Sequence, residues 1–280
     1  MRTRWIRRAL GLAAGLGVAA LAQATSAETG LKRLTLRQDL LGFEAVGRLD
    51  FDGGFCSASL IAPDLVLTAA HCLIHPKTGA RLDPTKALFR SGIRDGEAVA
   101  ESRGARAIVH PDYDPFDENG ARKVASDLGI LQLADPIPAG VASPFAVAES
   151  PGTGAEVSVV SYARGRDAAP SWQRRCSISA QLIGVVEMTC ESESGASGSP
   201  VFDLSSGRPR IVSVISGRVF REGHVSVWGM QAAEALPRLK ADFRADRGVW
   251  PARAAVAPRR LTVGVGATRP REGGARFVRP

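Results

Sequence analysis

A serine-rich stretch at residues 191–203 (ESESGASGSPVFD) has the residue types that acyl transfer requires. Gly195 and Gly198 stand close on either side of Ser197. Glycines beside a serine let the backbone turn tightly, which exposes the hydroxyl and points backbone N–H groups at one place. Such a stretch alone is more often an ordinary turn. The prediction of chemistry therefore depends on a base and an acid elsewhere in the chain.

Hydrolysis through a serine also needs a base that accepts the hydroxyl proton and a group that orients this base. The chain has four histidines, and His71 differs from the others because it ends an apolar segment, LIAPDLVLTAAHC, among small alanines. Asp127 stands at the head of another apolar run, ASDLGILQL. A carboxylate in such a place needs a partner, and an imidazolium would supply one. We therefore predict that His71 and Asp127 act together with Ser197.

The elements that must position these residues are short strands. Apolar runs broken by Gly, Pro, Asp or Ser recur along the chain, and runs of this kind without helices between them predict an antiparallel all-β sandwich or barrel system. One helix is expected near residues 230–244, with Pro237 near its start or at a kink. The predicted strands are residues 44–51, 57–61, 65–69, 105–109, 128–133, 156–161, 178–186, 200–202, 211–216 and 224–228.

The net charge of +8 belongs to the two ends of the chain. Residues 1–27 contribute +4 and residues 246–280 contribute +6, which leaves about −2 between them. A nucleic-acid partner is therefore not expected for the body. Residues 246–280 are rich in Arg, Pro and Gly, so disorder is expected there, with a tether to an anionic surface as the alternative.

The first end has the pattern of an export signal. Basic residues precede an apolar run at residues 9–22, and small residues follow it, so cleavage is expected after Ala24 or Ala27. The run is too short for a stable membrane anchor. We therefore expect residues 1–27 to be a signal peptide and the mature chain to be secreted or periplasmic, without membrane insertion, as a monomer.

Four cysteines in an exported chain favour two disulfides, and three connectivities are open. Pairing Cys56 with Cys72 and Cys176 with Cys190 would close two loops of about 15 residues, each worth roughly 3 kcal/mol. A zinc site is the alternative, because His71 and His75 flank Cys72, but no CxxC pair supports it. No metal or other cofactor is expected.

Three ordered motifs resemble the trypsin-like (chymotrypsin-fold) serine peptidases, in particular their exported bacterial members. The motifs are LTAAHC at 67–72, the run that begins at Asp127, and GASGSP at 195–200, whose GxSGSP form is similar to the glutamyl-endopeptidase branch. The resemblance covers roughly residues 43–240. It implies two antiparallel β-barrels with a catalytic cleft between them, followed by the C-terminal helix, in a domain at residues 28–245.

The resemblance also implies a role for each matching residue. Ser197 would be the nucleophile, His71 the general base and then acid, and Asp127 the carboxylate that orients the histidine. The backbone amides of Gly195 and Ser197 would form the oxyanion hole. Ser216 would support the aspartate.

Further implications concern the disulfides and the substrate. The resemblance pairs Cys56 with Cys72, which leaves Cys176 for Cys190. The substrate backbone would pair as an added strand with Ser216, Gly217 and Arg218.

The sequence departs from the family pattern at three places. Ala196 replaces the acid that binds a newly cleaved N-terminus in the animal digestive enzymes. Glu191 occupies the position of the acid that selects Lys or Arg, beside Ser192 as a pocket wall, but it could also face water or be neutralised by Arg218. Ile215 and Ser216 stand where glutamyl-specific enzymes carry a pocket histidine, so a preference for Glu is unsupported unless His224 takes that role.

These observations predict a secreted serine endopeptidase that forms an acyl-enzyme on a protein or peptide substrate, with Glu191 expected to favour a basic residue before the scissile bond. The alternative from another class is an inactive trypsin-like homologue that acts as a protein- or surface-binding module. A lipase or esterase would need a strand, turn and helix around the serine, and the sequence does not predict them.

Overall fold

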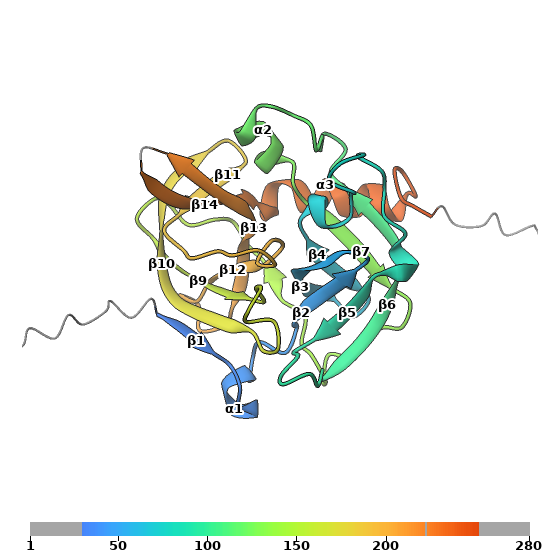
Figure 1. The fold of residues 1–280 in the computed structure, drawn as a ribbon, viewed down its shortest axis with the longest axis horizontal. Coiled ribbons are helices and arrows are strands. Elements are labelled where there is room, and N and C mark those ends of the chain that lie inside the picture. The colour runs from blue at the N-terminus through green and yellow to red at the C-terminus, as the bar shows by residue number, and fades with distance from the viewer. Residues whose placement is uncertain (1–29, 222, 252–280) are drawn as a thin grey trace, which may run out of the picture.

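The chain folds into two six-stranded antiparallel β-barrels that lie side by side, as the computed structural model of residues 30–221 and 223–251 shows (Figure 1). The predicted all-β class with two barrels is confirmed. The first barrel has the strand order β2-β3-β4-β7-β6-β5. Its strands are β2 (Val46–Phe51), β3 (Gly54–Ala62), β4 (Leu65–Thr68), β5 (Leu88–Ser91), β6 (Ala100–Val109) and β7 (Gly129–Leu133).

The second barrel closes through one long strand. The first part of β10 (Ser171–Leu182) pairs with β9 and its last part pairs with β11, which joins the two ends of the sheet. The short strands β1 (Leu31–Arg33) and β8 (Ala146–Val147) add to β10 and β13. The other strands are β9 (Glu156–Ser161), β11 (Val185–Met188), β12 (Pro200–Asp203), β13 (Arg210–Arg221) and β14 (His224–Gln231).

The single strand predicted at residues 178–186 is wrong. The chain reverses after Leu182, and Gly184 has φ +75° in the turn before Val185 begins β11. Such a φ suits glycine, which has no Cβ to clash with the backbone. The apolar residues on both sides of the turn hid the hairpin, because the run looks continuous in the sequence.

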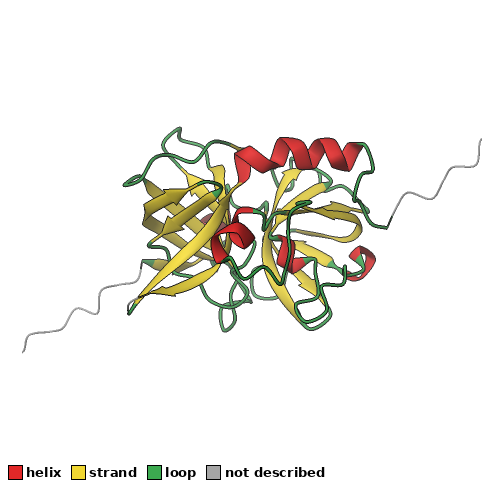
Figure 2. Cartoon of the chain, turned by 90° about the horizontal axis from the view of Figure 1, so that it is seen from above, coloured by secondary structure: helices red, strands yellow, loops and turns green. Residues whose placement is uncertain are grey.

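The predicted C-terminal helix is present as α3 (Ala232–Arg244), with Pro237 inside it. The helix follows β14 of the second barrel and extends across the first barrel (Figure 2). It buries Leu236, Leu239 and Phe243 at a helical spacing of three and four residues. The shorter helices are α1 (Arg37–Leu40), α2 (Gly120–Ala125) and the 3-10 helices η1 (Ala70–Cys72) and η2 (Pro84–Lys86).

The ordered structure continues past the expected domain boundary at Ala245. The backbone of Trp250 forms two hydrogen bonds with Ala107 of β6, at 2.7 and 2.9 Å, and its indole N–H donates to the Leu82 carbonyl at 2.8 Å. Val249 is buried. The segment from residue 246 to residue 251 therefore belongs to the domain and packs against the outside of its first barrel, at β6.

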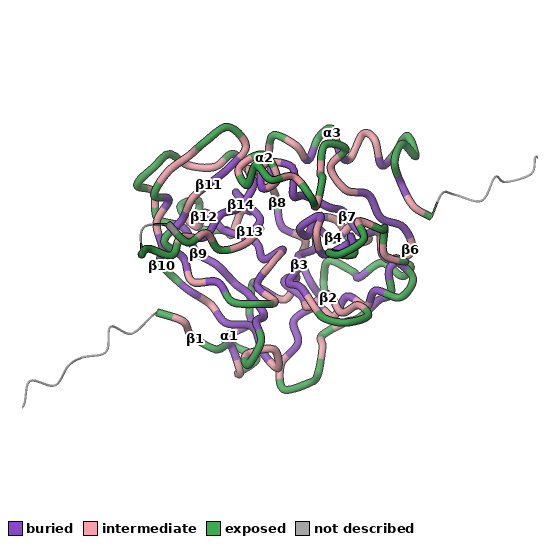
Figure 3. The backbone as a smooth tube through the Cα atoms, turned by 45° about the horizontal axis from the view of Figure 1, so that its top comes forward, coloured by how far each residue is buried: buried purple, intermediate pink, exposed green. Residues whose placement is uncertain are grey.

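Burial follows the strands of both barrels, whereas the connecting loops are largely exposed (Figure 3). Within the described ranges, none of the helices has the length and apolar character needed to cross a membrane. The expected signal peptide at residues 1–27 and the part of the expected tail beyond residue 251 lie outside the described residues.

Candidate active site

The two barrels each supply part of the predicted triad. His71 lies in η1, directly after β4, and Asp127 lies between α2 and β7, so both come from the first barrel. Ser197 lies in the loop between β11 and β12 of the second barrel. The structure thus brings together three residues that are far apart in the sequence.

Asp127 binds His71 through both its carboxylate oxygens. The backbone N–H of His71 donates to Oδ1 at 2.9 Å, and the ring Nδ1 lies 2.7 Å from Oδ2. The Ser216 hydroxyl donates to the same Oδ2 at 2.5 Å. A carboxylate accepts hydrogen bonds, so these contacts favour the tautomer with the proton on Nδ1, which leaves Nε2 free to accept a proton.

The charges of this pair stabilise each other. Loss of water around the ring lowers the pKa of His71, but the Asp127 carboxylate outweighs this effect, so the pKa lies above its ordinary value. Lys123 acts in the opposite direction on the same pKa. Burial raises the pKa of Asp127, yet His71 and the Ser216 hydroxyl bring it below its ordinary value. Asp127 is therefore ionised at neutral pH although its side chain is only 2% exposed.

The hydroxyl of Ser197 donates to the Ser216 carbonyl oxygen at 3.4 Å. Among the residues that the structure describes, no hydrogen bond joins it to His71. The His71 side chain is 33% exposed, so the ring is partly open to solvent. A serine hydroxyl rotates readily, and catalytic hydrogen bonds are often long without substrate.

The loop around Ser197 is built from two successive tight turns. Two successive turns are closed by hydrogen bonds from Ala196 N–H to the Glu193 carbonyl at 2.9 Å and from Ser199 N–H to the Ala196 carbonyl at 3.0 Å. The third residue of each turn is a glycine with positive φ, +98° at Gly195 and +79° at Gly198. The sequence GASGS therefore encodes the turn that its composition suggested.

Within the described ranges, the two predicted oxyanion donors are free, while groups next to them are paired. The Ser194 carbonyl accepts from Arg164 at 2.7 Å, and the Gly198 N–H donates to Ile215 at 2.7 Å. For the N–H groups of Gly195 and Ser197, by contrast, no acceptor occurs among the described residues. Backbone donors normally find a partner. Two unpaired N–H groups two residues apart, on successive turns, are the kind of donor pair that stabilises a tetrahedral oxyanion.

The predicted substrate-binding segment has one free edge. Strand β12 ends its pairing with β13 at Pro200 and Val214. Ser216, Gly217 and Arg218 lie further along β13, where β14 is its one partner among the described strands. A Cβ added at Gly217 would have no other atom within 4 Å, so the space beside this residue is open. An extended peptide could therefore add as a strand at this edge. Beside this edge, residues of α2, β13 and β14 line a hollow of about 380 Å³, among them Lys123 and Trp228.

The charges around Glu191 differ from the expected pairing. Arg218 binds Glu193, at 3.1 Å, and does not neutralise Glu191. The pKa of Glu191 lies above its ordinary value, because burial and the charge of Glu193 raise it by more than the positive charge of Arg166 lowers it. Ser192, beside Glu191 in the sequence, is buried. His224 is exposed at the tip of the β13–β14 hairpin.

The cysteines form two disulfides, Cys56–Cys72 and Cys176–Cys190, which are the two pairs that the sequence suggested. The first bridge connects β3 to the turn that carries His71. Cys56, Cys72 and His71 also lie close enough together to suggest metal ligands. The two sulfurs are bonded to each other, so they offer no thiolate to zinc.

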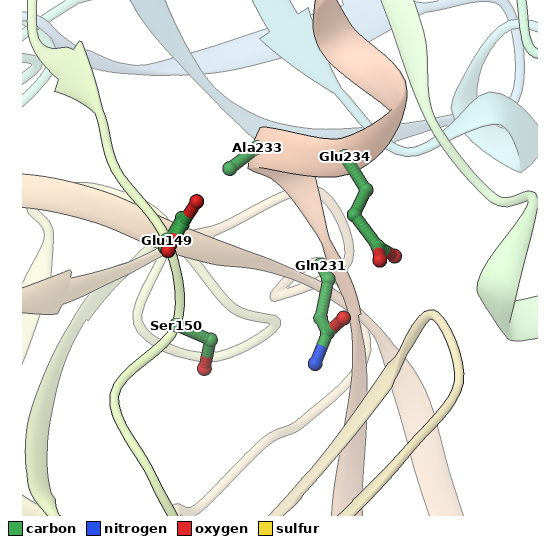
Figure 4. Close-up of a pocket in the computed structure, with 5 residues that line it drawn as sticks. All are labelled: Glu149, Ser150, Gln231, Ala233 and Glu234. Carbon is green, nitrogen blue, oxygen red and sulfur yellow. The ribbon is translucent and has the colours of Figure 1, made fainter.

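A second hollow lies away from the triad, where the linker after β8 meets the start of α3 (Figure 4). Its volume is about 360 Å³, and Glu149, Ser150, Gln231, Ala233 and Glu234 line it. None of these residues is among those predicted for catalysis.

The sequence did not point to three residues that act on the site: Ser57, Lys123 and Arg166. Lys123 and Arg166 are ordinary charged residues in loops or short helices, and only the fold places them near His71 and Glu191. Ser57 lies in a run of small residues, CSASL, where nothing separates it from Ser59. No local pattern would have found them.

A family model described as trypsin-like peptidase domain matches residues 56–210. The match covers more than half of the chain, so the protein belongs to the trypsin-like peptidase family. Clotting factor C from Tachypleus tridentatus and Limulus clotting factor C from Carcinoscorpius rotundicauda are similar to it, each 28% identical over 88 residues, 29% of this chain. The similarity spans only 8% of the length of these relatives.

A solved structure of a Glu endopeptidase in complex with MPD shares the fold. The two structures have a TM-score of 0.64, and the match covers 77% of this chain and 97% of that chain at 18% sequence identity. The chymotrypsin-like architecture and the resemblance to glutamyl endopeptidases are thereby confirmed.

Proposed function

We propose that this protein is a serine endopeptidase that works through Ser197, His71 and Asp127. The observation that carries the proposal is the contact between His71 and Asp127 at 2.7 Å beside a serine turn with two unpaired amides. A base, an orienting acid, a nucleophile and an oxyanion site are what acyl transfer needs.

The reaction follows from the positions of these groups. Ser197 Oγ attacks the carbonyl carbon while its proton passes to His71 Nε2, and the amides of Gly195 and Ser197 stabilise the oxyanion. His71 then gives the proton to the leaving nitrogen, the C–N bond breaks, and an acyl-enzyme remains. Water attacks the ester and transfers a proton to His71, which returns it to Ser197 as the acyl–Oγ bond breaks.

Labelling with a fluorophosphonate tests this proposal directly. The mature protein should take up one label per chain, and Ser197→Ala should take up none. If the wild type stays unlabelled while a reference serine peptidase reacts, the protein is instead a trypsin-like binding module, consistent with the hydroxyl of Ser197 facing Ser216.

We propose further that Glu191 favours a basic residue before the scissile bond and that Arg166 limits this preference. Cleavage of a peptide library by the wild type, Glu191→Gln and Arg166→Met provides the test. The Gln variant should lose the preference for Lys and Arg, and the Met variant should strengthen it because a competing charge is removed. A wild type without that preference would exclude Glu191 from the pocket.

The disulfides agree with an oxidising compartment, and we propose that the chain is exported with residues 1–27 as its signal. N-terminal sequencing of the secreted protein should begin after Ala24 or Ala27. A chain that keeps Met1 would refute the proposal.

A further inference from the structure

Ser57 on β3 forms an unusual set of hydrogen bonds to the oxyanion loop. Its side chain is fully buried, and its hydroxyl lies 3.0 Å from the Gly195 carbonyl oxygen and 3.1 Å from that of Tyr162, so one proton serves two acceptors. The hydroxyl oxygen accepts from the Tyr162 N–H at 2.9 Å. The backbone N–H of Ser57 also donates to the Ser197 carbonyl at 2.8 Å.

Ser57 thus holds the carbonyl groups on both sides of Ala196. Ala196 is fully buried, and its methyl group offers no polar atom with which to anchor the loop. Among the described residues, the hydroxyl of Ser57 is the one hydrogen-bond donor to the Gly195 carbonyl. The loop is therefore fixed from the first barrel, through the backbone, and without an acid at position 196.

Close packing reinforces these bonds. A Cβ at Gly195 would lie 2.3 Å from the Phe55 ring, and one at Gly198 would lie 2.2 Å from the Ser57 carbonyl oxygen. The turn thus lies directly against β3, on the two residues that flank Cys56 of the disulfide. A small shift of β3 would move both oxyanion donors, because no space separates strand and loop.

We infer that Ser57 is a positioning residue that orients the Gly195 and Ser197 amides toward the oxyanion, in place of an ion pair at position 196. The inference rests on the proposed peptidase function. Without the hydroxyl, the Gly195 carbonyl loses its partner and the adjoining peptide can rotate. The donor geometry would then be lost in the transition state, whereas ground-state binding would change little.

Ser57→Ala provides the test, with Ser59→Ala as a matched control. Ser59 lies on the same strand, is also fully buried, and its hydroxyl has no hydrogen-bond partner among the described residues. The measurements are kcat and KM for p-nitrophenyl acetate per active site titrated with fluorophosphonate, and the acid limb of the pH profile. Titration removes any contribution from misfolded protein.

In Ser57→Ala, kcat should fall about ten- to a hundredfold, less than the 10²- to 10³-fold loss typical of removing a whole oxyanion donor. KM should stay within about twofold, and the acid limb should not move, because His71 and Asp127 keep their contact. Ser59→Ala should behave as wild type. If Ser57→Ala does not fold, Ser57→Cys replaces it and should show a smaller loss of kcat, because a thiol is a weaker donor.

The outcomes separate the inference from the proposed function. A wild type that takes up no label overturns both. A labelled wild type whose Ser57→Ala variant keeps its kcat, or whose loss is matched by Ser59→Ala, overturns the positioning role and leaves the peptidase function intact.

Discussion

Removing one disulfide at a time should separate stability from catalysis. Cys56–Cys72 spans 16 positions and joins β3 to the turn that carries His71, whereas Cys176–Cys190 spans 14 positions within the second barrel. All four cysteines are buried. Each pair is therefore replaced by alanine and not by serine, whose buried hydroxyl would need a hydrogen-bond partner. The two double variants therefore differ mainly in where the constraint is lost.

The magnitude follows from the loop lengths. In the chain-entropy relation, closing a loop of this size stabilises the folded state by about 3 kcal/mol at 25 °C, and the two loops differ by only about 0.1 kcal/mol. Both variants should therefore lose about the same free energy of unfolding. The catalytic effects should differ, because a displacement of about 1 Å at a catalytic group can cost roughly 10²-fold in rate.

Urea unfolding followed by tryptophan fluorescence measures the stabilities, and p-nitrophenyl acetate hydrolysis per titrated site measures kcat. In the Cys56/Cys72 variant, kcat should fall about ten- to a hundredfold because His71 loses its anchor. In the Cys176/Cys190 variant, kcat should stay within about twofold. Equal losses of kcat in both variants would refute the view that the first bridge positions the histidine.

Three further predictions follow from the site and the chain end. Lys123→Met should move the acid limb of the pH profile of kcat/KM to higher pH, because Lys123 lowers the pKa of His71 and the reaction needs a neutral imidazole. An acid limb at the wild-type pH would exclude an effect of Lys123 on His71. Asp127→Asn should lower kcat on the ester by about 10⁴-fold through the wrong tautomer, and a near-normal kcat would exclude the orienting role. Truncation after Ala245 should cost on the order of 3 kcal/mol in urea unfolding, whereas truncation after Pro251 should cost little.

The sequence predicted the parts of the site that local motifs encode. His71, Asp127 and Ser197 each stand in a short pattern with its own turn or strand signal, so their meeting could be expected from the resemblance. The class of the fold followed from the short strands. The β10–β11 hairpin was missed because its one turn signal, Gly184, lies within an apolar run.

The rest of the site depends on contacts between residues that are far apart in the sequence, and no local pattern predicts such contacts. Ser57 reaches Gly195 across 138 positions, and the choice between Ser57 and Ser59 depends on which of them faces the loop. The pairing of Arg218 with Glu193, and not with Glu191, is likewise set by the course of two loops. The sequence indicated that Arg218 and the acids near Glu191 lie in the same region, but it could not show which acid Arg218 binds.

The contact between Trp250 and Ala107 has a consequence for the order of events in synthesis. Ala107 is made early, but the residue that covers it is made 143 positions later, after both barrels and α3. A nascent chain therefore presents β6 uncovered, and pairings over such distances form slowly. The barrel that carries His71 and Asp127 therefore gains this contact only after both barrels and α3 have been synthesised, so it reaches its full stability late in synthesis.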